Sequence, residues 1–169
     1  MVIDSSLSWG PHVEYTVTNA SKKLWLLIRF KHLGASREQL ITLFQLKIRC
    51  LAEFAAPAFN GALTKQQSAD LEMIQKKAFG VILGSEYKSY SNALSVLSQD
   101  TLSSRRQLLS TNFALKCTKH PKHMDLFTPN PRYKVNQKSK KKYLEPLCKK
   151  TRYYKSAIPY LTRLLNTVV

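Results

Sequence analysis

The stretch T-K-Q-Q-S-A-D-L-E-M-I-Q-K-K-A-F-G-V-I-L-G, residues 64–84, encodes one complete amphipathic helix. Thr64 and Gln67 form a capping box, in which each side chain accepts a hydrogen bond from the backbone of the other residue. Apolar residues then recur at helical spacing, at Leu71, Ile74, Ala78 and Ile82. Gly84 is a typical residue for the C-terminal cap. This stretch therefore predicts a helix with one buried face, and Glu72 and Lys76 are expected to pair on its outer side.

Two further helices are predicted on the N-terminal side of this stretch. Pro11 suits the first turn of a helix that ends before Gly34, with an apolar face at Val13, Val17, Ala20, Leu24, Leu27 and Ile28. Ser36 and Gln39 form a second capping box. The helix that follows is expected to end or bend at Pro57 and to bury Leu40, Leu43, Phe44, Ile48, Leu51 and Phe54.

On the C-terminal side, the pattern predicts a short helix over 91–97 and a longer one over 102–119. The longer helix has its predicted apolar face at Leu102, Leu109, Phe113 and Ala114. Ser156 is placed to cap a last short helix that carries Ile158, Leu161, Leu164 and Leu165. Val2, Ile3 and Asp4 are too few to make a sheet alone. The predicted fold is all-α, a bundle of about five helices followed by a less regular tail with a short last helix.

Composition limits the class of protein. The chain has 169 residues, 44% of them apolar and 22% charged, which indicates a globular protein rather than a disordered one. Three cysteines, at positions 50, 117 and 148, form no closely spaced framework and favour a reducing compartment. The longest strongly apolar run is much shorter than a membrane span, and no signal peptide is recognised. We therefore expect an intracellular protein, in the nucleus or cytoplasm, that is neither secreted nor bound to a membrane.

The positive charge is concentrated at the C-terminal end. Lys and Arg number 27 against 10 Asp and Glu, and 14 of the 27 lie in 116–169 with only Asp125 and Glu145. This imbalance predicts a helical domain over 1–119 and a basic, Tyr- and Lys-rich tail over 120–169. Lysines neutralise phosphates and tyrosines stack on bases. The predicted nucleic-acid contacts are Lys134, Lys138, Lys140, Lys141, Lys142, Tyr143, Lys149, Lys150, Arg152, Tyr153, Tyr154 and Lys155. A solubilising tail without a ligand is the alternative.

Six segments, in order, resemble the region after the palm of non-LTR (LINE-type, jockey-like) retrotransposon reverse transcriptases. They are V-I-D-S-S-L-S-W-G-P-H-V at 2–13, K-K-L-W-L-L-I-R-F-K at 22–31, E-F-A-A-P-A-F-N at 53–60, L-E-M-I-Q-K-K-A at 71–78, L-x-x-R-R at 102–106 and I-P-Y-L-T-R-L-L-N at 158–166. Within E-F-A-A-P-A-F-N, Phe54 and Phe59 replace the family's Tyr and Trp. The resemblance implies a thumb and C-terminal connection, which in such enzymes grip the template-primer.

The same resemblance implies that this chain does not polymerise. Palm aspartates hold the two metal ions of such polymerases, and they belong to an Asp-Asp motif upstream of position 1. The sequence contains no Asp-Asp pair. We therefore expect a truncated fragment that begins inside a larger domain, is not an enzyme, needs no cofactor and binds RNA or DNA without sequence preference. A palm and fingers domain is a further expected partner. The alternatives are a stand-alone helical nucleic-acid-binding protein and a non-functional relic.

Two smaller features permit other interpretations. Cys117, His120 and His123, with Cys148 as a fourth ligand, have a spacing that zinc could use, although Pro121 divides the motif. The alternative is a basic helix end with surface histidines. Trp9 and Trp25 could stack on bases, but tryptophans at such positions more often fill the core.

An apolar patch is expected to remain open around Val2, Ile3, Leu7 and Trp9. Arg105 and Arg106 are expected to meet phosphate or to pair with Glu72 or Asp100.

Overall fold

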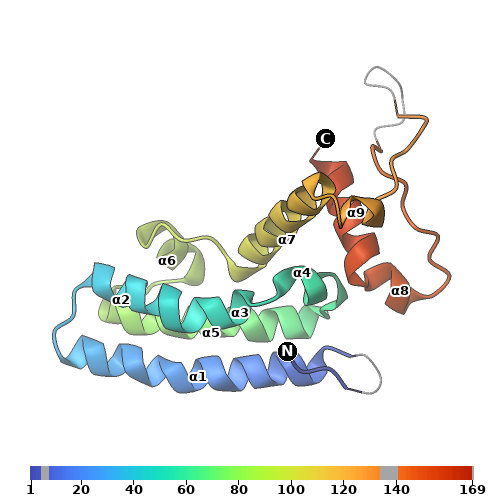
Figure 1. The fold of residues 1–169 in the computed structure, drawn as a ribbon. Helices are drawn as coiled ribbons and strands as arrows, with labels where there is room; N and C mark the ends of the chain where they lie inside the picture. Colours follow the sequence, from blue (N-terminus) through green and yellow to red (C-terminus); the bar gives the residue numbers. More distant parts are fainter. Residues whose placement is uncertain (5–7, 134–140, 169) are drawn as a thin grey trace. The chain divides into compact units, whose positions relative to one another are not determined.

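The computed structural model of the chain describes residues 1–4, 8–133 and 141–168. These residues form helices and connecting segments without any β-strand (Figure 1). Among them, Pro129 and Tyr143 make a single isolated antiparallel bridge. The predicted all-α fold is confirmed. None of the helices in these residues is long and apolar enough to cross a membrane.

The chain forms two compact units. Unit 1 consists of Met1–Phe54 and Leu63–Arg105, and unit 2 consists of Ala55–Ala62 and Arg106–Val169. Each unit is therefore built from two separate stretches of sequence. The predicted domains, 1–119 and 120–169, place a single boundary elsewhere and stay a prediction.

Unit 1 contains the longer helices. They are α1 (Gly10–His32), α2 (Arg37–Phe44), a π-helical segment η1 (Gln45–Arg49), α3 (Cys50–Glu53), α5 (Lys65–Leu83), a 3-10 turn η3 (Gly84–Glu86) and α6 (Tyr90–Val96). Helix α7 (Leu102–Lys119) contributes its first four residues to unit 1 and the rest to unit 2. The helices predicted to begin at Pro11 and over 102–119 have the predicted extents.

Local sequence sets the ends of these helices. Both predicted capping boxes are present, at Ser36 with Gln39 and at Thr64 with Gln67. Gly84 ends α5 with a φ of 60°, a conformation that glycine adopts without strain. The Lys31 ammonium also donates to the backbone oxygen of Val81 at 2.6 Å, where it satisfies a carbonyl of the last turn of α5 and stabilises the negative end of the helix.

The core of unit 1 lies where α1 and the α2–η1–α3 segment pack against α5 (Figure 1). Phe44 and Phe79 meet edge to face, with 5.3 Å between ring centroids, and Phe79 also contacts Tyr90. The predicted apolar face of α5 is fully or almost fully buried at all four positions, Leu71, Ile74, Ala78 and Ile82. Burial of these side chains supplies most of the free energy that holds α1, the α2–η1–α3 segment and α5 together.

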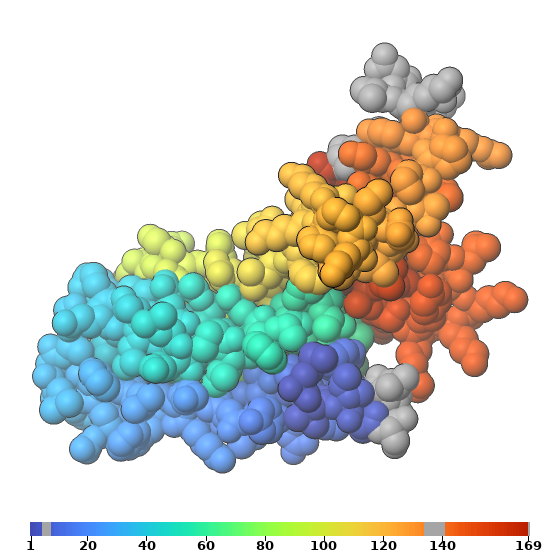
Figure 2. Space-filling view, viewed as in Figure 1, coloured from blue at the N-terminus to red at the C-terminus, as the bar shows by residue number. Residues whose placement is uncertain are grey.

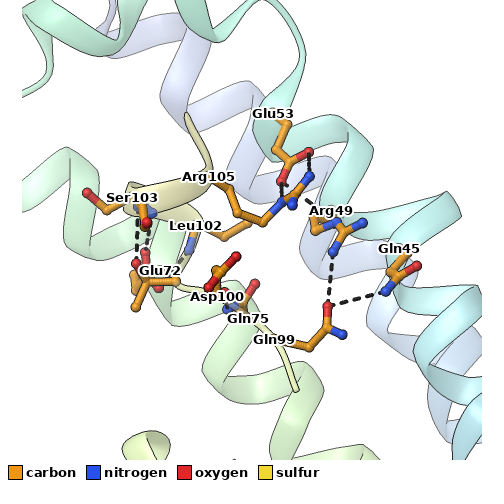
Figure 3. A network of polar contacts seen from close by, with 12 residues as sticks. Gln45, Arg49, Glu53, Glu72, Gln75, Gln99, Asp100, Leu102, Ser103 and Arg105 are labelled. Carbon is orange, nitrogen blue, oxygen red and sulfur yellow. Dashed lines mark hydrogen bonds and ion pairs between the residues drawn. The ribbon is translucent and has the colours of Figure 1, made fainter. Parts of the chain in front are cut away.

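A network of polar contacts attaches the start of α7 to this core (Figure 3). The carboxylate of Glu72 on α5 accepts hydrogen bonds from the backbone N–H groups of Leu102 and Ser103, at 3.0 and 3.2 Å. It also accepts from the Tyr90 hydroxyl, and burial together with this carboxylate raises the pKa of Tyr90. Glu72 therefore caps α7 from 30 residues away, and the expected pairing with Lys76 on the outer side is wrong.

The rest of the network joins α7 to η1 and α3. Arg105 donates to Glu53, which raises the pKa of Arg105, and Arg49 also lies within 3.7 Å of the same carboxylate. Gln99 accepts from Gln45 and Arg49 (Figure 3). The expectation that Arg105 pairs with Glu72 or Asp100 is thus wrong, because Glu53 takes that place.

Unit 2 contains α4 (Ala56–Phe59), a 3-10 turn η2 (Asn60–Ala62), most of α7, a 3-10 turn η4 (Met124–Leu126), α8 (Thr151–Lys155) and α9 (Ala157–Thr167). Ala55 has a left-handed φ of 59° and precedes α4, and Pro57 lies in the first turn of α4. Pro57 therefore begins a helix rather than ending the preceding one, which already stops at Glu53.

The core of unit 2 includes much of the predicted tail. Its buried residues are Ala114, Cys117, Phe127, Leu161, Leu164 and Leu165, with Leu115, Tyr143 and Tyr160 packed against them. Arg106 and Ser110 are also buried on α7, between the predicted apolar positions. The Arg106 side chain donates to the side-chain oxygen of Asn60 at 3.1 Å, a partner that was not predicted from the sequence.

Several side chains expected on buried faces are exposed. Phe54 is 60% and Phe113 47% exposed, and Ile28 and Ile158 are exposed as well. Of the patch expected to stay open, Val2 and Ile3 are exposed and Trp9 is partly buried, while Leu7 lies outside the described residues.

Candidate nucleic-acid interface

The candidate interface lies on α8 and its flanks in unit 2. Residues 146–168 contain five Lys and Arg and no Asp or Glu. Every residue of α8 is exposed, and so are Lys149 and Lys150 immediately before it. The predicted contacts that the structure brings together here are Lys149, Lys150, Arg152, Tyr153, Tyr154 and Lys155.

Two hydrogen bonds hold α8 in place relative to α9. The Ser156 hydroxyl donates to the backbone oxygen of Tyr153 at 2.7 Å, and the Arg163 guanidinium donates to the backbone oxygen of Tyr154 at 2.9 Å. Ser156 occupies the N-cap position of α9, as predicted, but its side chain makes no cap hydrogen bond there. Ser156 and Arg163 therefore connect the C-terminal part of α8 to α9.

Tyr153 and Tyr154 offer aromatic surface next to the cations, and each is 47% exposed. The guanidinium carbon of Arg163 lies 3.8 Å from the ring centroid of Tyr154, a cation–π contact that holds the ring. Arg163 is not among the contacts predicted from the sequence. A cation on α9 nine residues after Tyr154 carried no local signal, apart from being the last basic residue of a segment without acids.

The predicted contacts before α8 differ in their surroundings. Lys141 pairs with Glu145 at 2.9 Å, which offsets part of its charge, and the Lys142 ammonium lies 5.9 Å from the Tyr143 ring centroid. Tyr143 packs edge to face on Phe127, so its ring belongs to the core of unit 2 more than to the surface. Lys134, Lys138 and Lys140 lie outside the described residues.

Tyr143 is fixed by its backbone as well. Its N–H donates to the side-chain oxygen of Asn166 at 2.9 Å, and the Asn166 amide donates back to the Tyr143 carbonyl at 3.0 Å. The segment that carries Lys141 and Lys142 is therefore attached to α9, on which Arg163 also lies. This part of the predicted tail is thus positioned by its contacts with α9.

The residues considered for zinc do not form a ligand set in the structure. Cys117 is buried in the core of unit 2, and burial raises the pKa of its thiol. The rings of His120 and His123 stack on each other, 4.8 Å between centroids. Among the described residues, no three His, Cys, Asp or Glu side chains come together as a metal site would require.

The arrangement on α8 can do one thing chemically. Four exposed cations at Lys149, Lys150, Arg152 and Lys155, with two half-exposed rings and no neighbouring acid in sequence, suit a polyanion that also carries flat rings. We found no protein-family model, no curated protein and no solved structure that matches this chain.

Proposed function

We propose that this chain is thumb and connection sequence of a reverse transcriptase of the non-LTR retrotransposon type, and that it binds RNA or DNA without sequence preference. The ordered resemblance of six segments supports the family, and the all-α fold agrees with a thumb. The observation that carries the binding function is the exposed cluster of cations and tyrosines on α8 and its flanks, with no acidic residue in 146–168.

Binding through this cluster combines two kinds of contact. Lys149, Lys150, Arg152 and Lys155 neutralise backbone phosphates and release counterions, which gives affinity that depends on salt and not on base sequence. Tyr153 and Tyr154 stack on unpaired bases, which adds affinity for single strands but releases no counterions. The two contributions can therefore be separated by measuring affinity as a function of salt.

The test is the affinity of the full chain for fluorescently labelled RNA and DNA single strands and an RNA–DNA hybrid, measured by anisotropy over a range of salt. Replacing Lys149, Lys150, Arg152 and Lys155 by Gln together should flatten the plot of log K against log salt by about three units, because each phosphate neutralised on a single strand contributes about −0.7. Replacing Tyr153 and Tyr154 by Ala should weaken single-strand binding and leave the slope unchanged.

A matched control removes the same charge elsewhere. Lys47, Lys65, Lys77 and Lys88 are exposed lysines of unit 1, and replacing all four by Gln should change the slope by less than about half a unit. If the control and the α8 variant weaken binding equally, net charge rather than a site explains the affinity, and the proposed interface is wrong.

We further propose that this chain alone does not polymerise, because it contains no Asp-Asp pair to hold two metal ions. A primer-extension assay with Mg²⁺ or Mn²⁺ should yield no product above background. Incorporation of a labelled nucleotide by the purified chain would contradict this part of the proposal, whatever the binding assays show.

A further inference from the structure

One side of α1 carries aromatic and basic side chains that unit 1 leaves exposed. Residues three and four apart lie on one side of a helix, and the exposed residues with this spacing are Tyr15, Thr18, Lys22, Trp25 and Arg29. We name these five residues the α1 outer face. In Figure 2 the surface of α1, in blue, lies open along the edge of unit 1. At about 1.5 Å per residue the face is about 21 Å long.

The two rings on this face are unusually exposed. Trp25 is 59% and Tyr15 60% exposed, whereas tryptophan is buried to a large extent on average. The Arg29 guanidinium lies 5.5 Å from the Trp25 ring centroid, a cation–π contact that orients the indole. The burial pattern of α1 explains the exposure, because Ala20 and Leu27 point into the core and Trp25 occupies the opposite side of the helix.

The C-terminal half of this face carries only positive charge. Residues 22–32 contain Lys22, Lys23, Arg29 and Lys31 and no acid, and Glu14 is the single acidic residue of α1. Lys31 donates to the last turn of α5 and so serves the fold. Lys22 and Arg29 are exposed and form no ion pair with another described residue.

We propose that the α1 outer face is a second nucleic-acid site, which binds a single strand with bases stacked on Trp25 and Tyr15 and phosphates on Lys22 and Arg29. Charge complementarity selects a polyanion. Trp25 lies between Lys22 and Arg29, and Tyr15 lies farther along the same face, so the exposed rings select a polyanion with unpaired bases. A membrane-surface helix would need a continuous apolar side, and Thr18, Lys22 and Arg29 interrupt this one.

This inference goes beyond the proposed interface on α8, because the α1 outer face belongs to unit 1 and shares no residue with α8. Either site can exist without the other. Stacking on Trp25 also has its own optical signal, since the chain has only two tryptophans, Trp9 and Trp25, and both lie in unit 1.

The test uses the full chain with Trp9→Phe, which leaves Trp25 as the single tryptophan. Titration with an oligothymidylate of about 12 nucleotides, within the usual site size of single-strand binding folds, should quench Trp25 fluorescence in a saturable way. Replacing Trp25 by Ala should weaken binding about fivefold or more, the loss expected for one stacked base. Quenching should persist when Lys149, Lys150, Arg152 and Lys155 are all replaced by Gln.

Two matched variants control the experiment. Phe30→Ala removes an exposed ring of α1 that lies five residues from Trp25 and so on another side of the helix, and Lys88→Gln removes an exposed cation of unit 1. Both should keep the affinity within about twofold. Circular dichroism should show the same helix content in every variant.

Four results would overturn the inference. The first is oligothymidylate that binds, by anisotropy of a labelled strand, without quenching Trp25, and the second is quenching that disappears in the α8 variant. Neither of these would contradict the proposed function. The third is a blue shift of Trp25 emission with vesicles of anionic phospholipid and none with the oligonucleotide, which would assign the face to a membrane surface. A duplex that quenches as strongly as the single strand would refute base stacking.

Discussion

Replacement of Glu72 by Ala should destabilise unit 1 strongly, although Glu72 lies in the middle of α5. Its carboxylate accepts from the first two N–H groups of α7, those of Leu102 and Ser103 (Figure 3). It also accepts from the Tyr90 hydroxyl. The first N–H groups of any helix have no partner within the helix. Removing the carboxylate therefore takes the acceptor away from three donors at once.

The magnitude follows from the burial of each donor. Leu102 is almost fully buried, so its N–H has no access to water and its loss costs about 1–3 kcal/mol. Ser103 is exposed, and water replaces most of what its N–H loses. The Tyr90 hydrogen bond adds about 1 kcal/mol, which gives about 2–4 kcal/mol in total. Glu72→Gln keeps one acceptor oxygen but loses the charge at the helix N-terminus, and we expect about 1–2 kcal/mol.

Urea unfolding followed by tryptophan fluorescence measures this loss, because Trp9 and Trp25 both report on unit 1. Glu86→Ala is the matched control. Glu86 is a carboxylate in the same unit that pairs with Arg37 on the surface at 2.8 Å, and such a pair contributes less than about 1 kcal/mol. If Glu72→Ala costs no more than Glu86→Ala, the capping of α7 by Glu72 does not stabilise the fold and the reasoning fails.

Two further predictions concern pH and close packing. Burial lowers the pKa of His12, so the folded state binds its proton more weakly than the unfolded chain, and unit 1 should lose stability as pH falls through about 6.5. Urea midpoints at several pH values should show a loss of at most about 1.4 kcal/mol per pH unit, and His12→Phe should abolish this slope. Gly61→Ala should destabilise unit 2 by about 1–3 kcal/mol, because a Cβ there would lie 2.4 Å from the Tyr160 ring. Gly80→Ala, with open space around it inside α5, should instead stabilise unit 1 by up to about 1 kcal/mol, and thermal unfolding compares the two.

The helices and their ends could be predicted because their signals are local. A capping box needs two residues three apart, and both Ser36 with Gln39 and Thr64 with Gln67 form the predicted hydrogen bonds. The buried face of α5 follows from the apolar spacing alone. A structural feature that depends only on residues within one or two helical turns of each other can therefore be predicted from the sequence.

The buried face of α7 could not be predicted in this way. Its fully buried positions run through Leu102, Arg106, Ser110 and Ala114, a regular spacing of four whose middle members are polar. Hydrophobic periodicity predicts burial of Phe113, which is exposed, and does not predict burial of Arg106. One hydrogen-bond partner of the buried Arg106, Asn60, lies 46 residues away in sequence. Burial of a charged group depends on such distant hydrogen bonds, and no local pattern reveals them.

The candidate interface, too, could be predicted from the sequence only in part. The composition of the segment predicts a basic, tyrosine-rich surface but cannot distinguish one tyrosine from another. In the structure Tyr143 packs against Phe127, whereas Tyr153 and Tyr154 remain half-exposed. One further consequence follows from Arg163, which stacks on Tyr154 at 3.8 Å and covers one face of that ring. A base that stacks on Tyr154 must therefore use the other face. Arg163 then holds the ring and places a positive charge beside any bound strand, so its contribution comes from the packing of α9 against α8 and not from the composition of the tail.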